Sequence, residues 1–154
     1  MLTSPIFILA APLALLLVWL GSLRAAGPRP RPLIRLSAAA TWLGVGLSGV
    51  AIWLASTQGI LTSPVWGVAG LGASLRLDPL SVAIFCMVAL LAVPIVRFSA
   101  TYLDGDARQG TFIGRMCLTI AAVEVLIVSG NLALFTAAWI ATSLSLHTLL
   151  VFYR

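Results

Sequence analysis

The stretch FIGRMCLTIAAVEVLIVSGNLALFTAAWIATSLSLHTLLVF, residues 112–152, decides the fold of this chain. It contains two long apolar runs, separated by the short polar sequence Ser129-Gly130-Asn131. An α-helix needs roughly 17 to 25 mostly apolar residues to cross the hydrocarbon part of a bilayer, and both runs reach that length. A tight turn between them makes a helical hairpin in which Asn131 caps the second helix. The stretch therefore predicts two antiparallel membrane spans, at residues 112–128 and 132–152.

Three more apolar runs precede this hairpin, at residues 6–23, 36–56 and 79–98. The chain of 154 residues is 61% hydrophobic and 8% charged, with a mean hydropathy of +1.13. A soluble globular domain is about 25% charged, and a disordered chain combines few apolar residues with many charges, so both classes are excluded. We therefore predict an all-α fold: a polytopic membrane protein whose five transmembrane helices form a single membrane domain over residues 1–154.

The basic residues predict how these spans are oriented. All nine of them are arginine, against four acidic residues. If the N-terminus lies outside, residues 24–35 and 99–111 form inner loops, residues 57–78 form the outer loop, and the C-terminus lies inside. Every arginine except Arg76 is then on or near the inner side, as the positive-inside rule requires. The first run is expected to be a retained span rather than a signal peptide, because nothing basic precedes it and Arg24 follows it.

The connections between the runs carry signals of their own. Alternate prolines in residues 27–32 predict a stiff, non-helical inner loop, because proline removes backbone donors and favours extended chain. In the outer loop, the glycines and the alternation at Ser74-Leu75-Arg76-Leu77 favour a short β-hairpin. Asp78-Pro79 is typical of an N-cap followed by proline at the first helical position, so the third helix is expected to begin there.

Ionisable side chains inside the apolar runs are the candidate functional residues, since a charge at membrane depth is costly. Glu124 lies roughly 9 Å below the outer turn at about 1.5 Å per residue. It is an ion-path candidate that loads and releases a proton; the alternative is a carboxylate held by the helix backbone or by an arginine of a partner chain.

Arg115 and His147 form a second ion-path candidate. They lie at similar sequence distances on either side of Gly130, so they should share a depth towards the inner side. Histidine titrates near physiological pH, which suits proton passage. The alternatives are that Arg115 simply extends to the interface and that His147 makes a packing contact.

Charged residues of the second inner loop are candidates for docking a partner: Arg97, Asp104, Asp106 and Arg108. The alternative is that they only set topology. Cys86 and Cys117 lie inside apolar runs and are expected to be buried thiols. The sequence has no glycine-rich phosphate loop, no zinc-like Cys/His spacing and a single histidine. No catalytic residue, metal ligand or cofactor is therefore predicted in this chain, and nucleic acid is not an expected partner.

Several residues resemble those of a known family: Leu77-Asp78-Pro79-Leu80-Ser81, Tyr102, Phe112, Asn131-Leu132, Phe135 and Trp139. They are similar to the start of antiporter-like membrane subunits, which include the L subunit of respiratory complex I and the large Mrp antiporter subunit. In proton-pumping members a glutamate follows the tryptophan of the fifth helix, whereas Ile140 follows Trp139 here. Residues 97–99 (RFS), 105–106 (GD) and 142–147 (TSLSLH) resemble the membrane subunit of the bacterial DAB inorganic carbon accumulation complex.

That resemblance, over roughly residues 75–154, implies a transport subunit of the bacterial inner (cytoplasmic) membrane and not an enzyme. Such a subunit helps to couple a proton or sodium gradient to CO2 hydration and bicarbonate accumulation. The implied partner is a large cytoplasmic protein resembling a zinc β-carbonic anhydrase, and the zinc is expected in that partner. Glu124 is then the hypothetical replacement for the carboxylate that is missing after Trp139.

The resemblance also implies partners within the lipid bilayer. Family members have many more helices and carry lysines on the later ones, whereas this chain has no lysine. Further membrane chains are therefore expected to complete the ion path. Two other functions stay open: an ion-translocating subunit of a complex I-like or Mrp-type antiporter complex, and a purely structural piece of a split transporter.

Overall fold

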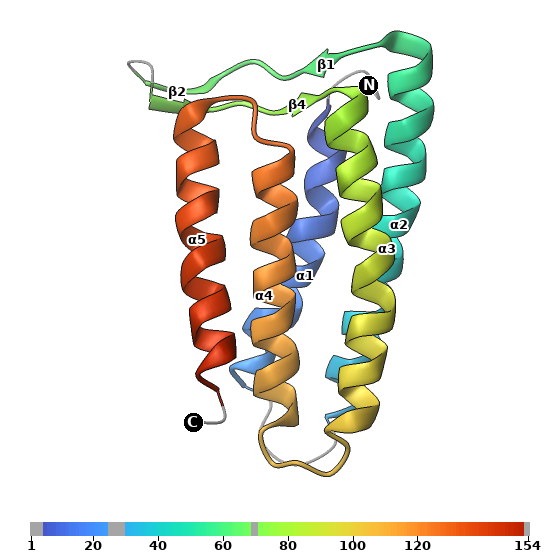
Figure 1. Cartoon of the computed structure of the whole chain (residues 1–154), viewed down its shortest axis with the longest axis vertical. Helices are drawn as coiled ribbons and strands as arrows, with labels where there is room; N and C mark the ends of the chain where they lie inside the picture. The colour runs from blue at the N-terminus through green and yellow to red at the C-terminus, as the bar shows by residue number, and fades with distance from the viewer. Residues whose placement is uncertain (1–4, 25–29, 69–70, 153–154) are drawn as a thin grey trace.

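The computed structural model describes residues 5–24, 30–68 and 71–152, and this part of the chain is mostly helical (Figure 1). A 3₁₀ turn, η1 (Pro5–Leu9), leads directly into the first helix. The long helices are α1 (Ala10–Ser22), α2 (Arg31–Gln58), α3 (Pro79–Tyr102), α4 (Gln109–Ile127) and α5 (Leu132–Leu150). Five helical segments are long and apolar enough to cross a membrane, the first being η1 together with α1. The predicted all-α fold class with five membrane helices is confirmed.

The helices run alternately up and down, so that the two termini lie at opposite ends of the bundle (Figure 1). Helix α1 packs on α2 and α4, α2 packs on α3, and α5 packs mainly on α4. We call the end that carries Arg35, Arg97 and Arg108 the arginine end, and the opposite end, which carries the strands, the strand end. Helix α5 stands at the edge of the bundle, where most of its side chains are exposed.

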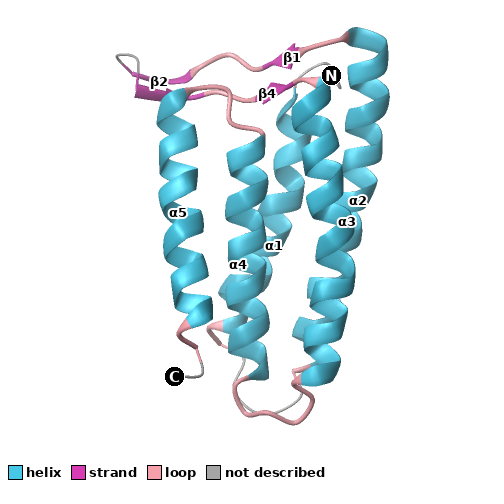
Figure 2. Ribbon diagram, in the orientation of Figure 1, coloured by secondary structure: helices cyan, strands magenta, loops and turns pink. Residues whose placement is uncertain are grey.

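Short strands cross the strand end above the helices (Figure 2). Strand β1 (Leu61–Thr62) pairs antiparallel with β4 (Arg76–Leu77), and β2 (Trp66–Val68) pairs antiparallel with β3 (Leu71–Ala73). The hairpin predicted for the long loop is confirmed. The turn between α4 and α5 joins this ribbon, because the Gly130 N–H donates to the Ser74 carbonyl at 2.7 Å. The Arg76 N–H likewise donates to the Val128 carbonyl at 3.0 Å.

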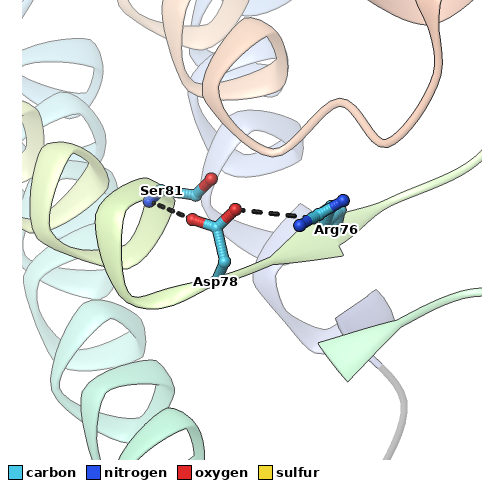
Figure 3. A network of polar contacts seen from close by, with 3 residues as sticks. All are labelled: Arg76, Asp78 and Ser81. Atoms are coloured by element: carbon cyan, nitrogen blue, oxygen red, sulfur yellow. Dashed lines mark hydrogen bonds and ion pairs between the residues drawn. The ribbon is translucent and has the colours of Figure 1, made fainter. Parts of the chain in front are cut away.

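Both predicted helix caps are confirmed. The Asp78 carboxylate accepts a hydrogen bond from the Ser81 N–H at 2.8 Å, and its other oxygen lies 3.4 Å from Arg76 Nε (Figure 3). The Ser81 N–H, and to a smaller extent the Arg76 charge, hold the pKa of Asp78 below its ordinary value despite partial desolvation. The ionised cap therefore stabilises this helix at neutral pH, and that stabilisation is lost as the pH falls through the lowered pKa.

Asn131 caps α5 in the same way. Its side-chain oxygen accepts from the Leu134 N–H at 2.9 Å, and its side-chain nitrogen donates to the Gly72 carbonyl. One side chain thus starts the last helix and ties it to the strands.

At the arginine end, α2, α3 and α4 extend beyond the apolar runs that predicted them. Of the proline segment predicted to be non-helical, residues 27–29 lie outside the described residues. The prediction is wrong for Arg31 and Pro32, which form the first turn of α2, where proline needs no backbone donor. Helix α3 continues to Tyr102 and α4 begins at Gln109. Hydropathy marks the part of a helix suited to hydrocarbon, whereas the helix itself continues until a capping or turn residue ends it.

Candidate ion-path site

Glu124 lies inside the bundle, where four helices meet. It is on the last turn of α4, and the residue is only 1% exposed. A Cβ added at Gly44 of α2 would be 3.4 Å from Glu124 Oε1, 3.6 Å from the Cβ of Ala89 in α3 and 3.8 Å from the Cβ of Ala11 in α1. Three small residues on three helices therefore leave room for the carboxyl group against the backbone of α2.

The carboxyl group is not satisfied by its surroundings. Within the described residues, Glu124 Oε2 is buried and has no hydrogen-bond partner. An unpaired charge in such surroundings costs several kcal/mol, of the order found for buried ions that lose their partner. Binding a proton or a cation removes that cost. The sequence left open that the helix backbone holds the Glu124 carboxylate. The unpartnered Oε2 argues against that alternative.

Arg115 reaches the last turn of α5. Its Nη1 donates to the Thr148 carbonyl at 2.8 Å, and its guanidinium carbon lies 4.8 Å from the centre of the Phe152 ring. His147, the residue before Thr148, is exposed. Arg115 therefore lies at the same depth in the bundle as His147. Its contacts with Thr148 and Phe152 also link α4 to the C-terminal end of α5.

Hydrogen bonds hold the loop from 103 to 108, one within the loop and one to Phe152 after α5. The Arg108 N–H donates to Asp106 Oδ1 at 2.7 Å, and Arg108 Nη1 donates to the Phe152 carbonyl at 3.4 Å. The Arg108 guanidinium carbon also lies 5.4 Å from the centre of the Phe152 ring. Asp104 is exposed on the same loop. Arg97 is exposed nearby, where it and Arg35 line a shallow groove between α2 and α3.

Gln109 is a buried polar residue that the sequence analysis does not single out. Gln109, the first residue of α4, is fully buried and donates from Nε2 to the Ala100 carbonyl at 2.6 Å. Its Oε1 has no hydrogen-bond partner among the described residues. The signal in the sequence was weak, because glutamine beside Arg108 at the start of a helix reads as a solvated interface residue.

The described residues hold no group of three or more His, Cys, Asp or Glu side chains placed to bind a metal ion. Cys86 and Cys117 are free thiols. Cys117 is fully buried on α4 as predicted, whereas Cys86 on α3 is only partly buried, so the prediction of a buried thiol is wrong there. Among the described ionisable side chains, Glu124 combines burial with an oxygen that has no hydrogen-bond partner.

Five helical segments that are long and apolar enough to cross a membrane, with a carboxyl group buried among four of them, define a multi-pass membrane protein. No protein-family model matches the chain. It is 38% identical over 87 residues to the probable inorganic carbon transporter subunit DabB2 of Halothiobacillus neapolitanus, a match that covers 56% of this chain and 16% of that protein. It is 29% identical over 117 residues to the probable inorganic carbon transporter subunit DabB of Hydrogenovibrio crunogenus, covering 74% of this chain and 23% of that protein.

These two matches confirm the resemblance to the membrane subunit of the DAB inorganic carbon accumulation complex. The chain spans less than a quarter of the length of either relative, since the matches cover 16% and 23% of them. The similarity therefore concerns one part of much longer transporter subunits.

Proposed function

We propose that this chain is part of the membrane subunit of an inorganic carbon transporter of the bacterial inner membrane. In this proposal it helps to couple a proton or sodium gradient to CO2 hydration and bicarbonate accumulation by a cytoplasmic partner. The observation that carries the coupling role is Glu124, which is 1% exposed with an unpartnered oxygen at the meeting point of four helices. The similarity to probable inorganic carbon transporter subunits supports inorganic carbon as the transported substance.

The proposed partner is a large cytoplasmic zinc protein resembling a β-carbonic anhydrase. Both relatives are named as subunits, which supports assembly with other proteins. The arginine end offers a surface for such a partner, because Arg97 and Asp104 are exposed beside the turn that Asp106 and Arg108 hold in place. A partner that binds an already ordered surface loses less of its binding free energy to the ordering of side chains and loops.

Purification of the tagged chain from its native membranes tests this partnership. We expect a large zinc-containing soluble protein to co-purify in a fixed ratio, detected by mass spectrometry and by elemental analysis for zinc. The combined change Arg97→Gln with Asp104→Asn is expected to reduce the co-purified zinc severalfold, because it removes charges from the docking surface. The combined change Arg76→Gln with Asp78→Asn, which removes one charge of each sign at the strand end, serves as the control and should leave the yield of zinc unchanged. Recovery of the intact membrane chains without any zinc protein would contradict the proposed partner.

A further inference from the structure

The groove between α2 and α3 at the arginine end brings two arginines together. Helices α2 and α3 lie side by side (Figure 1), and Arg35 of the first and Arg97 of the second line a groove of about 230 Å³. Arg35 is on the second turn of α2, and Arg97 is on the second-last turn of α3. Both side chains are exposed. Two guanidinium groups from distant parts of the chain therefore share one groove on the outer surface of the bundle.

The groove lies at the edge of the part of the bundle that suits hydrocarbon. Arg35 directly precedes the uncharged run 36–56 of α2, and Arg97 directly follows the uncharged run 79–96 of α3. At about 1.5 Å per residue these runs are roughly 32 and 27 Å long. The hydrocarbon core of a bilayer is about 30 Å thick. Both arginines are therefore at the depth where the hydrocarbon ends and the lipid headgroups begin.

The floor of the groove is apolar. Ile34 and Ala100 line it, and both pack against a buried cluster of apolar side chains inside the bundle. Val96 and the small Ala38 complete this floor, and Thr101 stands at the rim beside the arginines. The groove therefore offers positive charge at its rim and an apolar surface below it.

An exposed apolar surface continues from the groove towards the middle of the bundle. Trp42 follows Arg35 by seven residues, and Leu90 precedes Arg97 by seven. Seven residues are about two turns and return to the same face of a helix. Trp42 is 56% exposed and Leu90 is 52% exposed. An apolar chain that leaves the groove along α2 and α3 therefore meets further apolar side chains.

The two guanidinium groups have capacity for an anion. Within the described residues, neither Arg35 nor Arg97 forms an ion pair with an acidic side chain. The planar guanidinium group binds phosphate oxygens through two parallel hydrogen bonds, and it does so better than a lysine ammonium group. Basic pockets between membrane helices near the membrane surface are typical sites for anionic lipid headgroups.

We infer that this groove binds the phosphate of an anionic phospholipid between Arg35 and Arg97, with an acyl chain lying along α2 and α3 past Trp42 and Leu90. The inference goes beyond the proposed function, because it requires neither the zinc partner nor a role for Glu124. Arg97 also belongs to the proposed docking surface, whereas Arg35 does not. A change at Arg35 therefore tests the lipid site separately.

Photo-cross-linking tests the site in the complete complex, reconstituted into phosphatidylcholine vesicles that contain a small share of phosphatidylglycerol with a photoactivatable acyl chain. Arg35→Gln and Arg97→Gln should each lower the label on α2 and α3 peptides about fivefold, measured by mass spectrometry, because each arginine near the membrane surface contributes about that factor to affinity. Arg31→Gln is the matched control: it removes the same charge one turn earlier on α2, outside the groove, and should leave the label nearly unchanged. Ala38→Leu fills the groove without changing its charge and should also lower the label, so it serves if an arginine variant does not assemble.

Four results would overturn the inference. Absence of label on α2 and α3 in the unmodified complex would show that another membrane chain covers the groove. An equal loss in Arg31→Gln and Arg35→Gln would show a general attraction of lipid to positive charge instead of a site. Equal labelling by photoactivatable phosphatidylcholine would contradict the preference for an anionic headgroup. Displacement of the lipid by millimolar glycerol phosphate would show that a free phosphate compound, and not a lipid, is the ligand.

Discussion

Glu124→Gln is expected to lower gradient-dependent inorganic carbon accumulation tenfold or more while leaving the complex assembled. Glutamine has nearly the same size as glutamate, so it fits the space that Ala11, Gly44 and Ala89 leave. An amide, however, does not take up and release a proton near neutral pH. The change therefore removes the proposed chemistry without creating a cavity. The measurement is uptake of radiolabelled bicarbonate in cells that carry the whole complex, normalised to the amount of assembled complex.

Two further variants make that result specific. Asp78→Asn applies the same carboxyl-to-amide change at the strand end, where the carboxylate caps α3, and it should leave accumulation close to normal. Glu124→Asp keeps an ionisable group on a shorter side chain and should retain part of the activity. If Glu124→Gln accumulated carbon as well as the unmodified complex does, the residue would be structural, and a purely structural membrane chain would explain the data better.

Gly114→Ala should destabilise the bundle more than an alanine at any other glycine of the described helices. Helices α1 and α4 meet so closely there that an added Cβ would overlap Oγ and Cβ of Ser22 and would lie 3.6 Å from the Cα of Trp19. Relief requires α1 to move, because the overlap includes an atom next to its backbone. Overpacking of this kind costs about 1–3 kcal/mol, occasionally more. The measurement is the thermal unfolding midpoint of the purified complex in detergent.

Gly46→Ala is the matched control for this substitution. An added Cβ at Gly46 would have no neighbour within 4 Å, and alanine is favoured over glycine in a helix interior by roughly 0.5–1 kcal/mol. We therefore expect Gly46→Ala to be neutral or slightly stabilising. Equal midpoints for Gly114→Ala and the unmodified complex would show that α1 and α4 are not packed as described.

The local signals in the sequence predicted the architecture well. Asp78 and Asn131 start their helices as expected, because an N-cap needs only a side-chain oxygen and the N–H groups of the next turn. The ends of the helices were predicted less well: Arg31 and Tyr102 are helical although they lie outside the apolar runs. Hydropathy indicates whether a segment is stable in hydrocarbon or in water. The end of a helix instead depends on backbone conformation, such as the positive φ of Gly59 after α2.

The surroundings of the candidate site depend on contacts between helices, which a single sequence does not display. Glu124 stood out because a lone carboxylate in an apolar run is conspicuous, but its contact with Gly44 joins residues that are far apart in the chain. Gln109 did not stand out, since a glutamine beside an arginine is ordinary at the start of a helix. Its burial depends on the packing of α4 against α3, where it donates to the Ala100 carbonyl.

The most direct test of the whole account is the dependence of inorganic carbon accumulation on both this chain and a cation gradient. Bicarbonate accumulation would be measured in cells carrying the complete complex, with and without this chain, before and after a protonophore or a sodium ionophore collapses the gradient. The account predicts that removing the chain and collapsing the relevant gradient each reduce accumulation to the same background. Accumulation that persists unchanged without the chain, or with both gradients collapsed, would contradict it.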